Sequence, residues 1–251
     1  LLRQFDALRT AYPDMEHHVA TATAMREFVV RESDRTFFGP LLQHDAHEFL
    51  MTYIDCLRPD EPVLAEARMG VLRSTAACPI SGESSTRNTP YVVLSIPVAA
   101  TLQDSLTQLQ ELETLASENQ WISDGMKAGR VPRDAPTTKR LEIVRLPESQ
   151  VGIVFHVKRF QLVRGRPRKR SQPMQFPTRW CQQGDQTTPL RLRAVVVHHG
   201  SFGGGHYTAV VRSPENRDQW FQCDDARVRP TTLDHARQAA QIGYLVLYTA
   251  A

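Results

Sequence analysis

The sequence is poor in cysteine. Its four cysteines, Cys56, Cys78, Cys181 and Cys223, lie far apart, and no two of them form a Cys-x-x-Cys pair. Zinc knuckles and dense disulfide frameworks are built from closely spaced cysteines, so this spacing argues against both and predicts no metal site. We expect reduced thiols, as in a cytoplasmic or nuclear protein.

Long apolar runs, internal repeats and a strong net charge are also missing. No apolar run approaches the roughly 18 residues of a membrane span, which predicts that the protein is not a membrane protein. A net charge of +3 is too small to predict binding to nucleic acid. The N-terminus does not resemble a signal peptide, and the chain opens on Leu1 rather than Met.

The chain has the composition of a globular protein. With 251 residues, 41% of them hydrophobic and 23% charged, it can form one or two domains with a full core. Apolar residues at helical spacing predict helices at residues 1–12, 21–30, 41–57 and 233–240, and a further helix after Thr101. Alternating apolar residues predict strands at residues 91–98, 151–160, 190–197 and 242–248. Stretches rich in Gly, Pro and Ser predict loops at residues 58–88 and 123–138. Helices thus dominate the first hundred residues and antiparallel strands the last hundred, which indicates an α+β fold.

The most informative stretch covers residues 198–225. Three glycines stand directly before His206, and a polar turn separates a strand predicted at 207–211 from another at 220–223. In such an antiparallel hairpin, His206 at the start of one strand lies near Asp224 at the end of the other. A carboxylate that accepts from one imidazole nitrogen leaves the other nitrogen to act as a base. Each residue alone is more often an ordinary polar residue, but the glycines favour a place where another backbone comes close.

A basic run covers residues 164–170, with four arginines and one lysine. We interpret it as a solvated hairpin tip. The alternative is a nuclear signal or a patch for an acidic partner.

Several stretches, read in order, resemble the ubiquitin-specific protease family of cysteine deubiquitinases. They are Gln43-His-Asp-Ala-His-Glu-Phe-Leu50, His156-Val-Lys-Arg-Phe160 after Leu146-Pro147, Phe176-Pro177, Val195-Val-Val-His-His-Gly200, Gly205-His-Tyr207 with Trp220 to Asp225, and Gly243-Tyr-Leu-Val-Leu-Tyr248. The resemblance spans nearly the whole chain. It implies a papain-like fold in a single catalytic-type domain, with a partial helical thumb at residues 1–66, fingers at 67–150 and a palm at 151–251.

The resemblance also implies partners and roles. The partner is ubiquitin or a ubiquitinated protein, no cofactor is needed, and an activating protein partner is compatible with the family. His206 is the expected general base and Asp224 its orienting acid, with Asp225 as the alternative or as a helper on the oxyanion side. The expected substrate-binding residues are Gln43, Asp45, Glu48, Tyr207, Gly204 and Gly205. Asp45 and Glu48 are expected to meet arginines near the C-terminus of ubiquitin, while the glycines and Tyr207 line a narrow channel for its Gly-Gly end.

The chain departs from the family pattern in two places. No Gly-Asn-x-Cys box precedes Gln43, so the nucleophilic cysteine is missing. We favour a fragment of a longer protease over a pseudo-enzyme that binds ubiquitin without cleaving it. In the fingers, Cys78 with Ser81 and residues 121–124 stand where many relatives have zinc-binding pairs. We expect apolar packing of Tyr91, Val93 and their neighbours to hold this region instead.

Two further alternatives stay open. A papain-like or transglutaminase-like acyl transferase would use the same His and Asp but would not need acids at positions 45 and 48. A nucleic-acid module built on residues 164–170 has no aromatic platform beside its charges.

Overall fold

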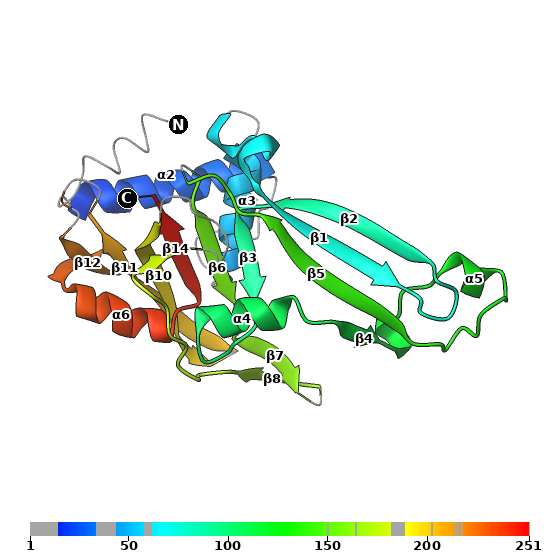
Figure 1. Ribbon diagram of the computed structural model, residues 1–251. Helices are drawn as coiled ribbons and strands as arrows, with labels where there is room; N and C mark the ends of the chain where they lie inside the picture. The colour runs from blue at the N-terminus through cyan, green and yellow to red at the C-terminus, as the bar shows by residue number, and fades with distance from the viewer. Residues whose placement is uncertain are drawn as a thin grey trace.

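The computed structural model of the protein describes residues 15–33, 44–57, 62–149, 151–163, 165–181, 189–201, 203–213, 216 and 218–250. Figure 1 shows a body of helices and strands from which a long, narrow sheet projects. The α+β class predicted from the sequence is confirmed. None of the helices that the structure describes is both long and apolar enough to cross a bilayer.

The large sheet has the strand order β13-β12-β11-β10-β14-β6-β3, and β9 pairs with β10. Its strands are β3 (Val93–Ile96), β6 (Ile153–Val157), β9 (Arg179–Trp180), β10 (Leu190–Ser201), β11 (Gly204–Arg212), β12 (Trp220–Asp224), β13 (Arg227–Thr231) and β14 (Leu245–Thr249). Strand β3 runs parallel to β6, and the neighbours from β6 to β13 run antiparallel. The strands predicted in the last hundred residues are all present. The predicted strand at 242–248 begins later, at Leu245, because the preceding helix extends to Gln241.

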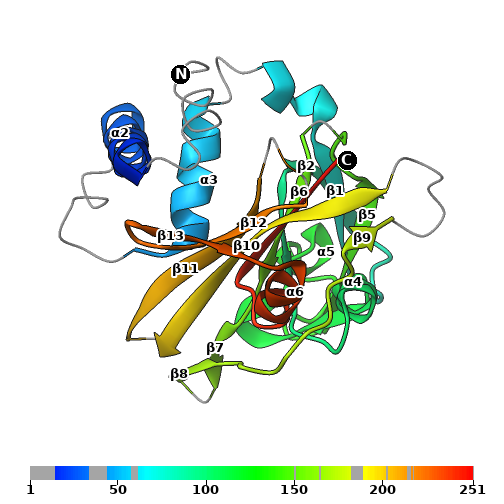
Figure 2. The same cartoon turned by 90° about the vertical axis from the view of Figure 1, so that its left-hand side faces the viewer.

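Helices cover both faces of this sheet, as Figure 2 shows. On one face, α3 (Ala46–Leu57) packs Ala46 and Leu50 onto Val154 and Leu245 of the sheet. On the other face, α4 (Leu102–Leu109) and α6 (Leu233–Gln241) pack against the main core. The residues that form this core from the sheet include Phe155, Val195, Val197, Val210, Val246 and Tyr248. The sheet is therefore apolar on both faces, and its strands combine alternation with continuous apolar runs.

The helices confirm the predicted positions but not all the predicted ends. Helix α2 (Met15–Ser33) is longer than the predicted helix at 21–30. Helix α3 begins at Ala46 rather than at residue 41, because Asp45 accepts hydrogen bonds from the backbone N–H groups of the first turn. The hydroxyl of Thr101 caps α4 as predicted, but the helix ends at Leu109. The predicted helix at 1–12 lies outside the described residues.

A second sheet projects from the body with the order β2-β1-β5-β4. Its strands are β1 (Gly70–Ala77), β2 (Ser84–Tyr91), β4 (Glu113–Leu115) and β5 (Thr137–Arg145), and 3-10 turns lie at η2 (Pro62–Leu64), η3 (Glu66–Arg68) and η4 (Ser117–Asn119). The loops predicted at 58–88 and 123–138 are therefore wrong in part. The first holds β1 and most of β2, and the second holds α5 (Asp124–Lys127) and the start of β5, while residues 78–83 and 128–136 form no helix or strand.

The polar composition of β2 explains this error. Its residues from Ser84 to Thr89 are exposed on both faces, so the strand has no apolar alternation to detect. Pairing with β1 over the whole length of both strands holds it in place instead. A strand defined by its ladder rather than by burial cannot be read from hydrophobic periodicity.

The far end of this second sheet has its own small core. Cys78, Met126, Val131 and Ala135 are buried together, and Trp121 packs against them. The carboxylate of Glu83 accepts from the backbone N–H of Gly125 at 2.9 Å and from the hydroxyl of Ser81 at 3.1 Å, which joins the β1–β2 turn to α5. The expectation that Tyr91 and Val93 hold this region is wrong. Tyr91, at the end of β2, is buried in the main core, and Val93, in β3 of the large sheet, packs in the cluster beneath α3.

The basic run forms a two-stranded hairpin from β7 (Phe160–Val163) and β8 (Arg166–Lys169). The predicted hairpin tip is confirmed for its described residues. Arg166 and Arg168 are exposed, but Lys169 is partly buried.

Arg159 lies buried between this hairpin and the end of α6. Its guanidinium donates to the carbonyl oxygens of Gly243 at 2.8 Å, Gln241 at 2.7 Å, Gln172 at 2.9 Å and Arg170 at 3.1 Å. These acceptors are neutral, and burial lowers the pKa of Arg159 to about 10. One planar donor group therefore ties three chain segments together.

We expect the substitution Arg159→Met to destabilise the protein by about 3 kcal/mol or more, because each unsatisfied buried polar group costs about 1–3 kcal/mol. Urea unfolding of the chain measures this. The neighbouring Lys158 is exposed, so Lys158→Met should change stability by less than about 0.5 kcal/mol. If R159M loses as little free energy of unfolding as K158M, the four hydrogen bonds of Arg159 contribute little to stability.

Candidate active site

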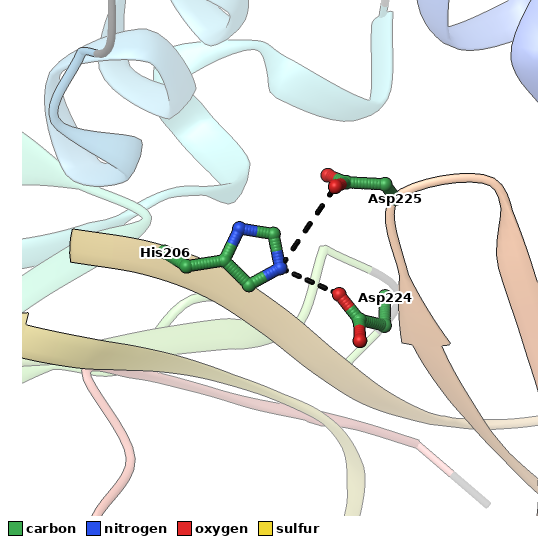
Figure 3. Close-up of side chains that lie close together, drawn as sticks. All are labelled: His206, Asp224 and Asp225. Carbon is green, nitrogen blue, oxygen red and sulfur yellow. Dashed lines mark hydrogen bonds and ion pairs between the residues drawn. The ribbon is translucent and has the colours of Figure 1, made fainter.

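His206 and Asp224 form a hydrogen-bonded pair at the end of the large sheet (Figure 3). The Nε2 atom of His206 in β11 lies 2.5 Å from Oδ1 of Asp224 in β12. Both side chains are about half exposed, at 43% and 46%. The structure thus brings together the two residues that the hairpin prediction placed side by side.

The register of the two strands explains the pair. Ala209 pairs with Cys223, so Asp224 falls near residue 208, on the same face as His206 two residues along. Diagonal neighbours of this kind in an antiparallel pair are within reach of long side chains. A slip of one residue would turn Asp224 to the opposite face.

The pair fixes which nitrogen of His206 carries the proton. The carboxylate only accepts, so Nε2 donates to Asp224 and Nδ1 is left on the other side of the ring. The hydrogen bond to Asp224, with the nearby charges of Asp225 and Asp224, raises the pKa of His206. The same hydrogen bond lowers the pKa of Asp224. An imidazole held in one tautomer by an ionised carboxylate can accept a proton at Nδ1.

Asp225 contributes at longer range. Its Oδ2 atom lies 3.9 Å from Nε2 of His206, and its side chain is 83% exposed. Its backbone takes the left-handed conformation with φ of 49°, which Asp adopts more readily than most residues, in the turn between β12 and β13. The geometry therefore favours Asp224 over Asp225 as the residue that orients the imidazole.

Asp45 joins the start of α3 to β11, the strand that carries His206. Its Oδ1 atom accepts from the backbone N–H of His47 at 2.9 Å and of Glu48 at 3.0 Å. Its Oδ2 atom accepts from the phenol of Tyr244 at 2.5 Å and from that of Tyr207 at 3.4 Å. Burial and the charge of Asp45 raise the pKa of Tyr207 to about 12, so the phenol stays protonated and donates.

The other predicted substrate-binding residues lie in α3, at the start of β11, or outside the described residues. Glu48 is exposed in the first turn of α3. Gly204 and Gly205 begin β11, and a side chain at position 205 would overlap the carbonyl of His199 and the ring of His198. Gln43 lies outside the described residues.

Three side chains have donor atoms that could converge on a metal ion. Within the part of the chain that the structure describes, His206, Asp224 and Asp225 have ligand atoms within 4.8 Å of one another. A cation there would take the Nε2 atom that Asp224 already binds. Metal binding and orientation of the imidazole by Asp224 therefore exclude each other at this place.

The sequence did not reveal the residues that support the site. Tyr244 was part of a predicted closing strand, and its bond to Asp45 joins residues 199 positions apart. His198 packs its ring against Tyr207 at 4.8 Å between centroids. In the sequence, only the glycine at position 205 indicated that another group packs closely against the backbone there.

Comparison with known proteins identifies similar chains. A family model described as "Ubiquitin carboxyl-terminal hydrolase" matches residues 1–248. Ubiquitin carboxyl-terminal hydrolase 2 of Gallus gallus is 29% identical over 189 residues, which cover 72% of this chain and 51% of the relative. Ubiquitin carboxyl-terminal hydrolase 21 of Homo sapiens is 28% identical over 206 residues, which cover 76% of this chain and 34% of the relative. The chain thus spans about half or less of these relatives.

Solved structures show a similar fold. The SAGA Ubp8/Sgf11/Sus1/Sgf73 DUB module bound to ubiquitin aldehyde contains a chain that is 24% identical, with a TM-score of 0.63 and coverage of 86% of this chain and 51% of that one. A chain of the yeast SAGA DUB module is 25% identical, with a TM-score of 0.62 and coverage of 82% and 50%.

The substitution Asp224→Asn tests the assignment of the orienting acid. We expect it to lower the pKa of His206, because it removes the ionised acceptor that favours the imidazolium. NMR titration of the imidazole measures this, and Asp225→Asn is the matched control with a smaller expected fall. An equal or larger fall in D225N would assign the orienting role to Asp225.

The pKa shift of His206 also makes the stability of the folded chain depend on pH, in a defined direction. Because the folded pKa of His206 is raised, its contribution to stability is present at pH values below the unfolded pKa and is lost as the pH rises through the folded pKa.

Proposed function

The chain belongs to the ubiquitin carboxyl-terminal hydrolase family, and from this we propose that the protein containing it cleaves the bond after the C-terminal Gly-Gly of ubiquitin. The observation that carries the proposal is the His206–Asp224 pair, which leaves Nδ1 of His206 for proton transfer. Such a pair is what a thiol hydrolase needs to activate its nucleophile. The fold shared with the solved deubiquitinating modules supports the papain-like architecture.

In the part of the chain that the structure describes, the side chain of His206 meets two carboxylates, those of Asp224 and Asp225. None of the four cysteines is in a disulfide bond. Cys78 is buried in the small core at the far end of the second sheet, and Cys223 precedes Asp224 on its strand and so faces the opposite side of the sheet. We therefore propose that the reactive thiolate is supplied by a part of the whole protein other than these four cysteines.

The same observation favours a second candidate function. Without a thiol beside His206, the protein would bind ubiquitin but not cleave it. The two candidates share a fold and a partner, so only a test of covalent chemistry separates them.

The substrate-binding residues divide into two roles in this proposal. The four hydrogen bonds to Asp45 fill the acceptor positions of its two oxygens, so Asp45 acts by holding Tyr207 against the channel. Glu48, exposed one turn along, is the carboxylate offered to the arginines near the end of ubiquitin. Gly204, Gly205 and Tyr207 form the wall along which the Gly-Gly end passes, and residues 1–66, 67–150 and 151–251 act as thumb, fingers and palm.

The solved structures and the cysteines of the chain support a proposal for the partners and the cellular location of the protein. One solved structure with a similar fold is a module of Ubp8 with Sgf11, Sus1 and Sgf73, bound to ubiquitin aldehyde. We propose ubiquitin as the substrate of this protein, and a further protein as a partner that activates it. Four cysteines outside disulfide bonds fit the reducing conditions of the cytoplasm or nucleus.

A ubiquitin probe with a C-terminal electrophile tests the catalytic proposal. We expect the full-length gene product that contains this chain to form a covalent adduct, and His206→Gln to slow it by about 100-fold or more, since a general base contributes about 10²–10⁴ in rate. Binding of unmodified ubiquitin by the same proteins is the control for folding. Binding without an adduct would favour the inactive ubiquitin-binding candidate, and neither binding nor adduct would contradict both.

Charge reversal at Glu48 tests substrate recognition. We expect Glu48→Lys to raise KM for a ubiquitin substrate roughly three- to tenfold and to leave kcat unchanged, because an exposed ion pair contributes modest ground-state binding. Steady-state kinetics measure this. Glu111→Lys, at an exposed position after α4, is the control and should leave KM unaltered. An unchanged KM in E48K would remove Glu48 from the binding surface.

A further inference from the structure

Lys169, in the basic hairpin, directs its ammonium group at the turn that leads to His206. Its Nζ atom donates to the carbonyl oxygen of His198 at 2.6 Å and to that of Gly200 at 3.0 Å. The third donor reaches Nδ1 of His198 at 3.1 Å. An ammonium has three donors and no acceptor, so all three are used and Nδ1 of His198 must be the unprotonated nitrogen. This one side chain joins β8 to the end of β10.

The ring of His198 is enclosed by the same contacts. It packs edge-on against Phe160 of β7 at 5.2 Å and against Tyr207 of β11 at 4.8 Å between centroids. The stem of Lys169 brings Nζ to 5.9 Å from the centre of the Phe160 ring, within the range of a cation–π contact. His198 therefore has one position and one tautomer while Lys169 is bound to it.

His198 in turn lies directly beneath the residue before His206. A Cβ at position 205 would overlap the ring of His198 and the carbonyl of His199, so the backbone of Gly205 rests on the imidazole. In the β10–β11 ladder, His198 pairs with Tyr207, His199 with His206, and Gly200 with Gly205. The three groups that Lys169 binds thus belong to residues opposite positions 205 and 207, on either side of His206.

We propose that Lys169 is a positioning residue for the reaction: it fixes His198 and the end of β10, and through them the backbone that presents His206 and the wall of the Gly-Gly channel. This inference rests on the proposed function, because its consequence is measured in the rate of that reaction. It gives the basic hairpin a role that a solvated tip does not have. The neighbouring Arg168 alternates to the other face of the strand and takes no part.

The substitution Lys169→Met keeps most of the apolar stem and removes the three donors. We expect kcat of the full-length gene product on a ubiquitin C-terminal substrate to fall about ten- to hundredfold, as small misplacements of catalytic groups do. KM should change less, since Glu48 and the rest of the binding surface are untouched. Lys169→Arg keeps the charge and donors and should recover part of kcat. Arg168→Met, one residue away and exposed, should leave kcat and KM unchanged.

NMR titration of His198 in the 251-residue chain provides a reading that needs no catalysis. Burial is the main cause that lowers the pKa of His198, and the charges of Lys169 and His199 lower it further while Asp45 raises it. Removing the charge of Lys169 should raise this pKa in K169M and leave it unshifted in R168M. If Lys169 only stabilised the fold, its substitution would not have to raise the pKa of His198.

The outcomes separate the two proposals. If the wild-type protein does not cleave the ubiquitin C-terminal substrate, the proposed function fails. The titration of His198 still decides whether Lys169 binds His198. If the wild-type protein cleaves the substrate and a folded K169M keeps full kcat, Lys169 is not a positioning residue. Should K169M not fold, His198→Gln removes the ring beneath Gly205 from the other side of the contact. A folded H198Q with full kcat would overturn the inference, and a reduced kcat would support it.

Discussion

The hydrogen bond between His206 and Asp224 depends on the register of two antiparallel strands. The two residues are 18 positions apart, and only the pairing of β11 with β12 places the imidazole diagonally across from the carboxylate. Because side chains alternate along a strand, the register has to be held to the residue. Strands β10, β14 and β6 continue the same sheet, and apolar side chains on both of its faces fix their alignment. The core of the protein thus determines the geometry of a half-exposed polar pair.

Two polar side chains extend this control to the surroundings of the pair. Asp45 belongs to the helical layer and accepts from Tyr207 in β11 and from Tyr244 just before β14, so the position of α3 is coupled to the strand that carries His206. Lys169 belongs to the basic hairpin and binds the end of β10 from another direction. Both are charged groups whose partners are neutral donors or acceptors. Each therefore fixes distance and direction, as short bonds to charged groups do.

Part of this arrangement could be predicted from the sequence. The hairpin that joins His206 to Asp224 is local, its strands alternate, and its turn is polar, so the proximity of the two residues followed from short-range rules. The cap at Thr101 was local in the same sense. Strand β2 could not be found, because its residues are polar on both faces and only pairing with β1 defines it. The four bonds of Asp45 and the three of Lys169 join segments far apart in the chain, and a basic run gives no sign that one of its cations turns inward.

In the proposed reaction, Asp224 holds His206 through Nε2 and leaves Nδ1 for the reacting thiol beside the end of ubiquitin. The most direct measurement is an experimental structure of the covalent adduct between the full-length gene product and a ubiquitin electrophile. We expect the adduct sulfur to lie within hydrogen-bond distance of Nδ1 of His206, with the Gly-Gly end passing along Tyr207 and Gly205. A sulfur on the Nε2 side of the ring, or a Gly-Gly end bound elsewhere on the protein, would contradict it.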